Sequence, residues 1–483
     1  MLLALVGVVV LSAAKWRWSV QVALVLTVFE GALRKWVFPG LSQYIYFLKD
    51  FVLLGAYIGY YTSSAPKPSR LNPGLAVPLV VGCGAVLLQA LNPNLGSIIT
   101  GAFGVKAYLW YVPLLWILPA VFRDKDELFR FTRCFIILAV PLGILAIAQF
   151  NAPLDSPLNA YATETETVSS FGEDASRAQV TGTFSYISGY TSFLLLTFCL
   201  LVPNLLGSQK PIVLWSHAAV LCLLLGNMCM TGSRKNFVFI GLCLAVLSVT
   251  VLKQRHLLAG VHRTIFAGAT VIGMVLMLFS TAVDAIIGRA RAGEDFAERT
   301  SLFLPLLKSL PTVGVSGYGT GVSLAARSDL ASALNVSAPK SLPPYIDLEA
   351  NQVLYELGAA GFLAWYALRI ALLWGLWTTW ERVRDSRLKL LAAGAFTFHL
   401  AHLYLSVYLN HIANVYFWFM AGFILVLPRL DATAPAAHLG RSSRGRPKRR
   451  GRRTSPPVAV TSNTVPARFP QIGWFRSGET ASI

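Results

Sequence analysis

The sequence predicts an all-α fold, a polytopic bundle of about 12–14 transmembrane helices. Of the 483 residues, 55% are hydrophobic and only 13% are charged, whereas soluble domains carry about 25% charged residues. Apolar runs of about 18 or more residues, the length needed to cross a bilayer, recur along the chain. This composition excludes a disordered chain, a disulfide-stapled secreted domain and an ordinary cytosolic enzyme.

Thirteen apolar segments are candidate spans. The first two are short for a bilayer about 30 Å thick, so tilted or re-entrant arrangements stay open for them. The first residues lack the basic segment of a signal peptide, so we expect no cleaved leader. The segments are 2–14, 18–32, 43–62, 74–92, 106–122, 128–149, 187–207, 211–230, 237–252, 257–283, 350–374, 390–409 and 411–428.

Basic residues alternate between the loops, and this alternation predicts the orientation. One set of short loops holds few of them, namely Arg34, Lys35, Lys106, Arg234 and Lys235. Because Lys and Arg accumulate on the cytoplasmic side, the richer set is predicted to be inside and the N-terminus outside. The richer set holds Lys15, Arg17, Lys67, Arg70, Arg123, Lys125, Lys210, Lys253, Arg255, Arg382, Arg384, Arg387 and Lys389.

Two regions are predicted. Residues 1–428 form the bundle, with two larger extracytoplasmic loops at 151–186 and 284–349. Long loops on one face more often serve function than structure.

Residues 429–483 form a basic tail. The net charge is +19, and eleven Lys and Arg lie from residue 429 onward. The low-complexity run at 441–453 predicts a disordered cytoplasmic tail that meets anionic lipids. Lipid is favoured over nucleic acid as its partner.

Neither the cysteines nor the histidines predict a metal site. The six cysteines lie inside apolar runs without ligand spacing and are expected to be small buried hydrophobes. His399, His402 and His411 lack an accompanying carboxylate or cysteine, so we expect packing roles. No cofactor is predicted.

Charged residues near spans are informative because burying one costs about 2.5–3.5 kcal/mol at mid-helix. Glu30 and Arg34 are four residues apart and would share a helix face, and Lys49 and Asp50 interrupt an apolar run. A structural ion pair that locks helices together is the favoured interpretation.

A second charged group is the turn at 231–236, on the predicted outer side. Arg234 and Lys235 lie there against the positive-inside bias. The planar fork of Arg234 suits phosphate oxygens. An interfacial anchor role is the alternative.

The third group is the large outer loop and the helix after it. Glu349 and Glu356 are seven residues apart, so both could face the same side. The Gly-rich run at 314–321 lacks the spacing of a phosphate-binding loop, which argues against a nucleotide site. The other polar residues of this group are Arg289, Arg291, Arg299 and Asn351.

Several short motifs follow one another on the predicted outer side. They are residues 29–39, 104–106, 111–113, 177–186, 231–234, 298–303, 311–321 and 351–361. In this order the chain, over roughly residues 20–428, resembles the O-antigen ligase and O-antigen polymerase superfamily. Residues 29–39 resemble an exopolysaccharide-linked branch of it.

The resemblance implies a metal-independent glycosyltransferase. Its substrates would be an undecaprenyl-diphosphate-linked oligosaccharide and a saccharide acceptor, at the outer face of the bacterial inner membrane. A chain-length regulator protein is a candidate partner.

The resemblance also suggests roles for individual residues. Arg234 and Arg299 would stabilise the diphosphate leaving group. Ligases carry a His-Asn pair where this chain has Glu349-Ala350-Asn351. Either Glu349 replaces that histidine as general base, or the chain is a polymerase. Glu356 is the reserve base. The candidate substrate-binding residues are Arg177, Lys235, Arg289, Arg291, Asn351 and Glu356.

Three alternatives stay open. They are a ligase that acts on a lipid or protein acceptor, a polysaccharide transporter or flippase, and a membrane scaffold. The sequence contains no internal repeat with paired broken helices, which transporters often have.

Overall fold

A computed structural model describes residues 2–65, 67, 71–162, 168–171, 177–206, 210–254, 261–291, 309–324 and 348–432. The chain divides into two units, Met1–Ala434 and Pro435–Ile483, and the first is the subject below. Among the described residues the regular elements are helices, and strand pairing is limited to one isolated bridge between Ser170 and Ala178. The predicted all-α class is confirmed.

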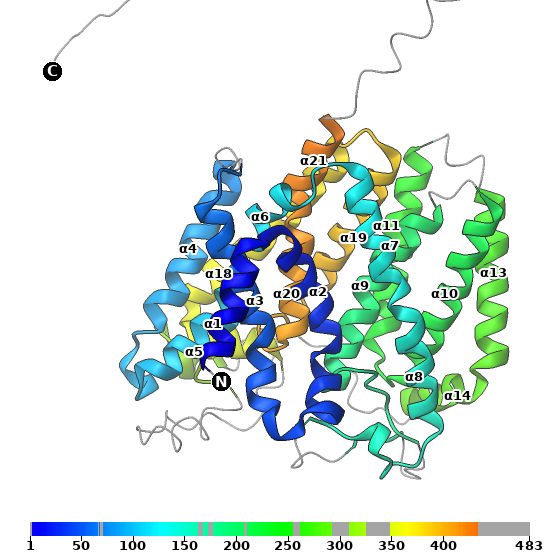
Figure 1. The fold of residues 1–483 in the computed structure, drawn as a ribbon, viewed down its shortest axis with the longest axis horizontal. Coiled ribbons are helices and arrows are strands. Elements are labelled where there is room, and N and C mark those ends of the chain that lie inside the picture. Colours follow the sequence, from blue (N-terminus) through cyan, green and yellow to red (C-terminus); the bar gives the residue numbers. More distant parts are fainter. Residues whose placement is uncertain are drawn as a thin grey trace, which may run out of the picture. The chain divides into compact units, whose positions relative to one another are not determined.

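Each predicted apolar segment coincides for most of its length with one helix or a consecutive pair (Figure 1). The short π-helical element η1 (Leu33–Val37) follows α2. The α-helices are α1 (Leu2–Ala14), α2 (Trp16–Ala32), α3 (Ser42–Thr62), α4 (Pro73–Gln89), α5 (Ile98–Leu109), α6 (Leu114–Val121), α7 (Lys125–Ile137), α8 (Ala139–Asn151), α9 (Ile187–Leu206), α10 (Pro211–Met230), α11 (Lys235–Lys253), α13 (Val261–Leu278), α14 (Ser280–Arg291), α18 (Glu349–Arg382), α19 (Ser386–Ala401), α20 (His411–Ala421) and α21 (Phe423–Ala432).

The helices are those of a multi-pass membrane protein. In the described chain six are long and apolar enough to cross a bilayer, and two bent pairs raise the number to eight. The pairs are α5 with α6, bent by 44°, and α13 with α14, bent by 81°. Thirteen crossings stay a prediction, because α2 and α19 have 17 and 16 residues, fewer than the roughly 20 that usually span. The six are Lys125–Asn151, Ile187–Leu206, Pro211–Met230, Lys235–Lys253, Glu349–Arg382 and His411–Ala432.

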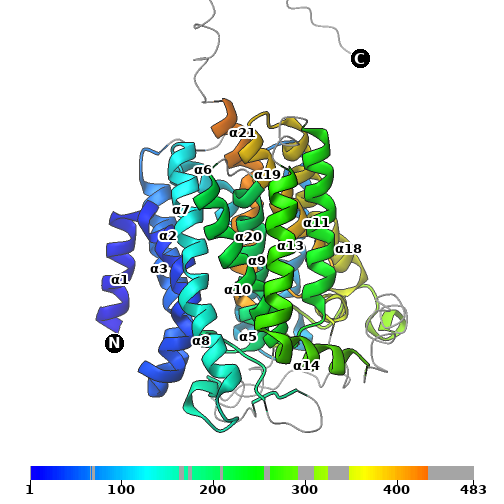
Figure 2. The ribbon, with the colours of Figure 1, turned by 90° about the vertical axis from the view of Figure 1, so that its right-hand side faces the viewer.

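Helices α9 and α20 lie at the centre of the bundle (Figure 2). Most side chains of α9 are buried. A helix that is apolar on every face needs neighbours on every side, and α9 contacts α7, α10, α11, α19 and α20.

The bundle has two ends with different polar groups. The connections 33–41, 152–162, 177–186, 231–234, 309–324 and 402–410 lie at one end, here called the loop end, which is the lower end in Figure 1. The turns at 122–124 and 383–385 lie at the other, here called the basic end, where Lys125 pairs with Asp385. The outer and inner loop sets of the sequence prediction therefore separate in space.

Candidate functional site

A segment here called the strap, residues 177–186, joins three helices at the loop end. The Val180 N–H donates to the Met230 carbonyl of α10 at 3.1 Å. The Gly182 N–H donates to Gln149 Oε1 of α8 at 2.8 Å. The Thr183 hydroxyl donates to the Val28 carbonyl of α2. The strap therefore links the turn of Arg234 to the charged residues near the N-terminus.

Those residues form a buried group, here called the cationic cluster. It has four basic side chains, two carboxylates and one imidazole, contributed by five elements. Its members are Glu30 (α2), Arg34 and Lys35 (η1), Lys49 and Asp50 (α3), Lys106 (α5) and His411 (α20).

Glu30 is the hub of one half of the cluster. Lys49 Nζ lies 2.6 Å from its Oε2, and His411 Nε2 lies 3.3 Å from its Oε1. Arg34 is 3.8 Å away. The predicted pair of Glu30 with Arg34 is present, but the contact with Lys49 is the closer one. The sequence carried one signal of it, a lysine inside an apolar run.

Asp50 is the hub of the other half. Its Oδ2 lies 2.7 Å from Lys106 Nζ in an ion pair, and its Oδ1 accepts the Tyr111 hydroxyl at 2.7 Å. The ring of Tyr46 lies between the halves, with Lys49 Nζ at 4.9 Å and Lys106 Nζ at 4.7 Å from its centroid. Cation–π contact of this kind stabilises buried cations.

Arg34 and Lys35 point to the strap. Arg34 donates to Ser185 Oγ at 3.0 Å. Lys35 Nζ donates to Thr181 Oγ1 at 2.6 Å, and no carboxylate pairs with it among the described residues. Burial lowers the pKa of the Lys35 amine to about 7. The cluster thus has a buried excess of basic groups, which a neutral Lys35 or a bound anion would relieve.

A second buried group surrounds the start of α18. Glu349 forms an ion pair with Arg369, and its other oxygen accepts the N–H groups of Val407 and Tyr408. Arg369 also donates to the His402 carbonyl at 3.3 Å. Both Glu349 oxygens are therefore occupied. Sequence reasoning missed Arg369, although an arginine within an apolar run was a signal.

Glu356, two turns further on, has a different environment. Its Oε1 accepts the Ser323 N–H at 3.0 Å and the Ser323 hydroxyl at 2.6 Å. The Tyr408 hydroxyl lies 3.1 Å from Ser323 Oγ, and its ring stacks on Tyr108 at 4.1 Å. Glu356 Oε2 has no partner of normal hydrogen-bond geometry within the described chain. The Tyr108 hydroxyl and the Gly321 backbone also interact with this buried carboxylate, and its Oε2 is left without a hydrogen bond of normal geometry.

The Gly-rich run holds Glu356 in place. Helix α18 is broken at Gly358, where φ is 70°, a conformation that favours glycine. The Tyr318 and Gly319 N–H groups donate to the Tyr355 and Glu356 carbonyls at 2.8 and 2.9 Å. The run therefore satisfies the carbonyls that the break frees.

Arg234 lies at the start of α11 and is half-buried. Its guanidinium makes no hydrogen bond or ion pair to the residues that the structure describes. The next side chain, Lys235, lies over the Tyr404 ring at 5.8 Å.

Other predicted substrate-binding residues lie around these groups. Arg177 lies over the Phe150 ring at 4.9 Å and donates to Asn151 Oδ1 at 3.4 Å. Asn351 is buried, and its Oδ1 has no hydrogen-bond partner in the described part of the chain.

The structure describes three of the predicted arginines only in part or not at all. Arg299 lies outside the described residues. Arg289 and Arg291 lie in the last turn of α14, with side chains outside the description.

The described residues contain no group of three or more His, Cys, Asp or Glu side chains that could hold a metal. The His399 ring packs on Phe417 and the His402 ring on Phe398, both at 4.1 Å. His411 instead joins the cationic cluster, which the sequence did not predict.

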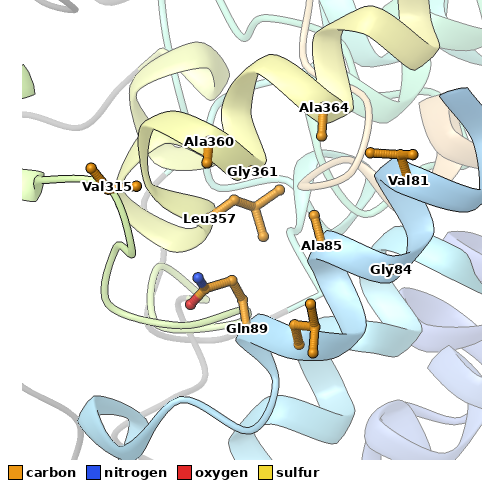
Figure 3. Close-up of a pocket in the computed structure, with 10 residues that line it drawn as sticks. Val81, Gly84, Ala85, Gln89, Val315, Leu357, Ala360, Gly361 and Ala364 are labelled. Atoms are coloured by element: carbon orange, nitrogen blue, oxygen red, sulfur yellow. The ribbon is translucent and has the colours of Figure 1, made fainter.

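An apolar groove of about 430 Å³ lies between α4 and α18 (Figure 3). Val81, Leu88 and Val315 on its walls are exposed, as expected of a surface that faces lipid. Leu357 lines it, one residue from Glu356. The full lining is Val81, Gly84, Ala85, Leu88, Gln89, Val315, Leu357, Ala360, Gly361 and Ala364.

Comparisons with protein-family models, curated proteins and solved structures return no match. The resemblance to the O-antigen ligase and polymerase superfamily stays a prediction.

Proposed function

We propose that this membrane protein transfers or polymerises undecaprenyl-diphosphate-linked oligosaccharide units at the outer face of the bacterial inner membrane, in exopolysaccharide or O-antigen biosynthesis. The observation that carries the proposal is the buried excess of basic groups in the cationic cluster, at the same end as the available carboxylate of Glu356. A lipid diphosphate is an anion whose charge grows as the sugar leaves.

The reaction needs a base and cationic stabilisation. The acceptor hydroxyl oxygen would bond to the anomeric carbon while the bond from that carbon to the diphosphate oxygen breaks. The hydroxyl proton would pass to Glu356, whose Oε2 makes no hydrogen bond of normal geometry among the described residues. The lipid diphosphate would leave toward Arg234 and the cationic cluster, with Arg299 as a further predicted contributor. Glu349 stays the alternative base, although its occupied oxygens favour a structural role.

The apolar groove supports a lipid-linked donor. It is open to the lipid-facing surface, and Leu357 places it next to the peptide unit of Glu356 (Figure 3). A polyprenyl chain is apolar along its length and suits such a wall.

Two rival functions make different use of the same features. A broken helix such as α18 is typical of transporters, where freed carbonyls bind ions. At Gly358 the carbonyls of Tyr355 and Glu356 are already occupied by the Gly-rich run, which favours chemistry over transport. A ligase acting on a lipid or protein acceptor would share the donor site and differ only in product.

The test is incubation of the purified protein, in vesicles, with a lipid-diphosphate oligosaccharide. Elongated saccharide is the expected product, and a chain-length regulator should change only its length distribution. Saccharide on a lipid or protein would indicate a ligase. Labelled oligosaccharide that crosses the vesicle membrane without formation of a new glycosidic bond would overturn the proposal in favour of transport.

A variant pair focuses that test. Arg234→Lys keeps the charge but loses the bidentate fork, so polymer should fall strongly at normal abundance. Arg133→Lys, on an exposed arginine of α7, is the matched control. Equal polymer from both variants would remove Arg234 from the donor site.

A further inference from the structure

We infer that three arginines at the basic end form a binding site for the phosphate group of an anionic phospholipid. They are Arg17 of α2, Arg123 of the turn between α6 and α7, and Arg429 of α21. The site is separate from the loop end and does not depend on the proposed function.

The fold brings these arginines together from three distant parts of the sequence. The Arg429 guanidinium donates to the carbonyls of Phe122 and Arg123, which fastens α21 to the α6–α7 turn. Arg17 lies near enough to Arg123 and Arg429 for their like charges to repel. Arg429 belongs to the sequence-predicted tail, so the sequence did not suggest this meeting.

The charge of the group is not balanced locally. Glu127 is the carboxylate that interacts with Arg17 and Arg429, and its Oε2 already accepts the Arg123 N–H at 2.7 Å. Asp124 is turned to the start of α7, where it accepts the Glu127 N–H at 2.8 Å. Two of the three guanidinium groups thus share one facing carboxylate.

Two lysines at this end have close carboxylate partners. Lys125 pairs with Asp385 and Lys253 with Glu381, both at 2.8 Å. In contrast, Arg17, Arg123 and Arg429 have no carboxylate within ion-pair distance among the described residues, so positive charge is in excess at this group.

Unused hydrogen-bond donors point to a ligand. The Nε–H groups of Arg17 and Arg429 are both buried and lack partners among the residues the structure describes. A buried donor on a charged group is costly to leave unpaired. Phosphate oxygens fit guanidinium forks in a bidentate manner.

The neighbouring surface favours a phospholipid over free phosphate. Trp18 and Val22 are four residues apart on α2 and are 70% and 46% exposed. Tryptophan beside a basic residue is typical of the membrane–water interface. A headgroup at Arg17 would therefore have an apolar path for its acyl chains. The predicted cytoplasmic leaflet is also the one rich in anionic lipid.

The test measures lipid binding to the full-length protein in detergent by native mass spectrometry and thermal unfolding. Phosphatidylglycerol should be retained and should raise the unfolding temperature, whereas phosphatidylcholine should not. The triple variant Arg17→Gln, Arg123→Gln and Arg429→Gln should bind phosphatidylglycerol about tenfold more weakly or worse. The tail is present in every variant, so its own lipid binding cancels.

The matched control removes the same charge from exposed arginines nearby, Arg130→Gln, Arg133→Gln and Arg387→Gln. It should bind like the wild type, and equal loss in both triples would overturn the site in favour of diffuse charge attraction. Equal stabilisation by inorganic phosphate would overturn the assignment to a lipid. If the triple variant fails to fold, the single variant Arg17→Gln should still retain less phosphatidylglycerol than the wild type. Retention equal to that of the wild type would overturn the proposal.

Discussion

At the scale of single residues, environment separates two carboxylates of one helix. Glu349 and Glu356 are chemically alike, and both are buried. Glu349 is neutralised by Arg369 and held by two backbone N–H groups. Glu356 is held by Ser323 through Oε1, and its Oε2 makes no hydrogen bond of normal geometry among the described residues. A base needs an oxygen that can accept a proton, which Glu356 has.

Glu356→Gln should lower the single-turnover rate about 10²–10⁴-fold, because the amide cannot accept the acceptor's proton. Protein abundance should stay near normal, because the amide keeps the contact with Ser323. The measurement is single-turnover transfer at matched amounts of purified protein. A wild-type rate would remove Glu356 as base.

Glu349→Gln should instead lower abundance and thermal stability. Arg369 would be left as a buried, unpaired cation, and breaking such a pair costs about 3–5 kcal/mol. Adding Arg369→Met to this variant should restore part of the abundance. Normal stability with lost turnover would return the role of base to Glu349.

Lys35 predicts a pH dependence of stability. Its pKa is about 7 in the folded protein against an ordinary value of 10.5, so between these values the unfolded chain binds more protons. Stability from this residue should therefore rise with pH between about 7 and 10.5. Below pH 7 the cost of the buried charge is present in full.

The measurement is the unfolding temperature of wild type and Lys35→Met from pH 6 to 9. As pH rises, the unfolding temperature of the wild type should increase relative to that of Lys35→Met, because Met carries no titrating group. Parallel curves would contradict the assignment. An anion bound in the cationic cluster should flatten the wild-type curve by keeping Lys35 protonated.

At the scale of elements, the break in α18 positions Glu356. Residues 349–357 and 359–382 are separated by Gly358 at positive φ, and the Gly-rich run fills the gap. The Thr320 N–H donates to the Gln89 carbonyl of α4 at 3.1 Å. Glu356, the run and α4 are thereby held as one unit.

Gly358→Ala should disrupt that unit. A Cβ there would collide with the Val315 carbonyl and would strain φ, at a cost of about 1–3 kcal/mol. Transfer should fall together with thermal stability. Gly375→Ala, in the regular part of α18 with only the Ile424 side chain near, should be close to neutral, and similar losses in both variants would contradict the special role of the break.

At the scale of the whole bundle, polarity divides the molecule into two ends. The loop end holds the cationic cluster and Glu356, and the basic end holds Lys125, Arg384 and the arginine group. By the positive-inside rule the basic end should face the cytoplasm.

Reporter fusions test this orientation. Fusions after Arg387 and after Arg453 should be cytoplasmic, and one at Ala325 should be extracytoplasmic. An extracytoplasmic reporter at Arg453 would reverse the orientation and would place the proposed chemistry on the wrong side.

The sequence by itself determined the helical class and the separation of the loops into two sets. Both follow from local properties, because apolar run length and loop charge are read along the chain. It also indicated Glu30, Lys49, Asp50 and Arg234 as unusual for their surroundings, since a charge among apolar residues is costly wherever it lies.

Only the tertiary structure decided which charges meet. Lys49 pairs with Glu30 across two helices, Glu349 with Arg369 along one, and Arg17 meets Arg429 from the far end of the chain. The separation of two residues along the sequence does not give the distance between them when they lie on different helices. A carboxylate with both oxygens paired differs from one with an unpaired oxygen only in its balance of burial and pairing. That balance is established only when the helices pack.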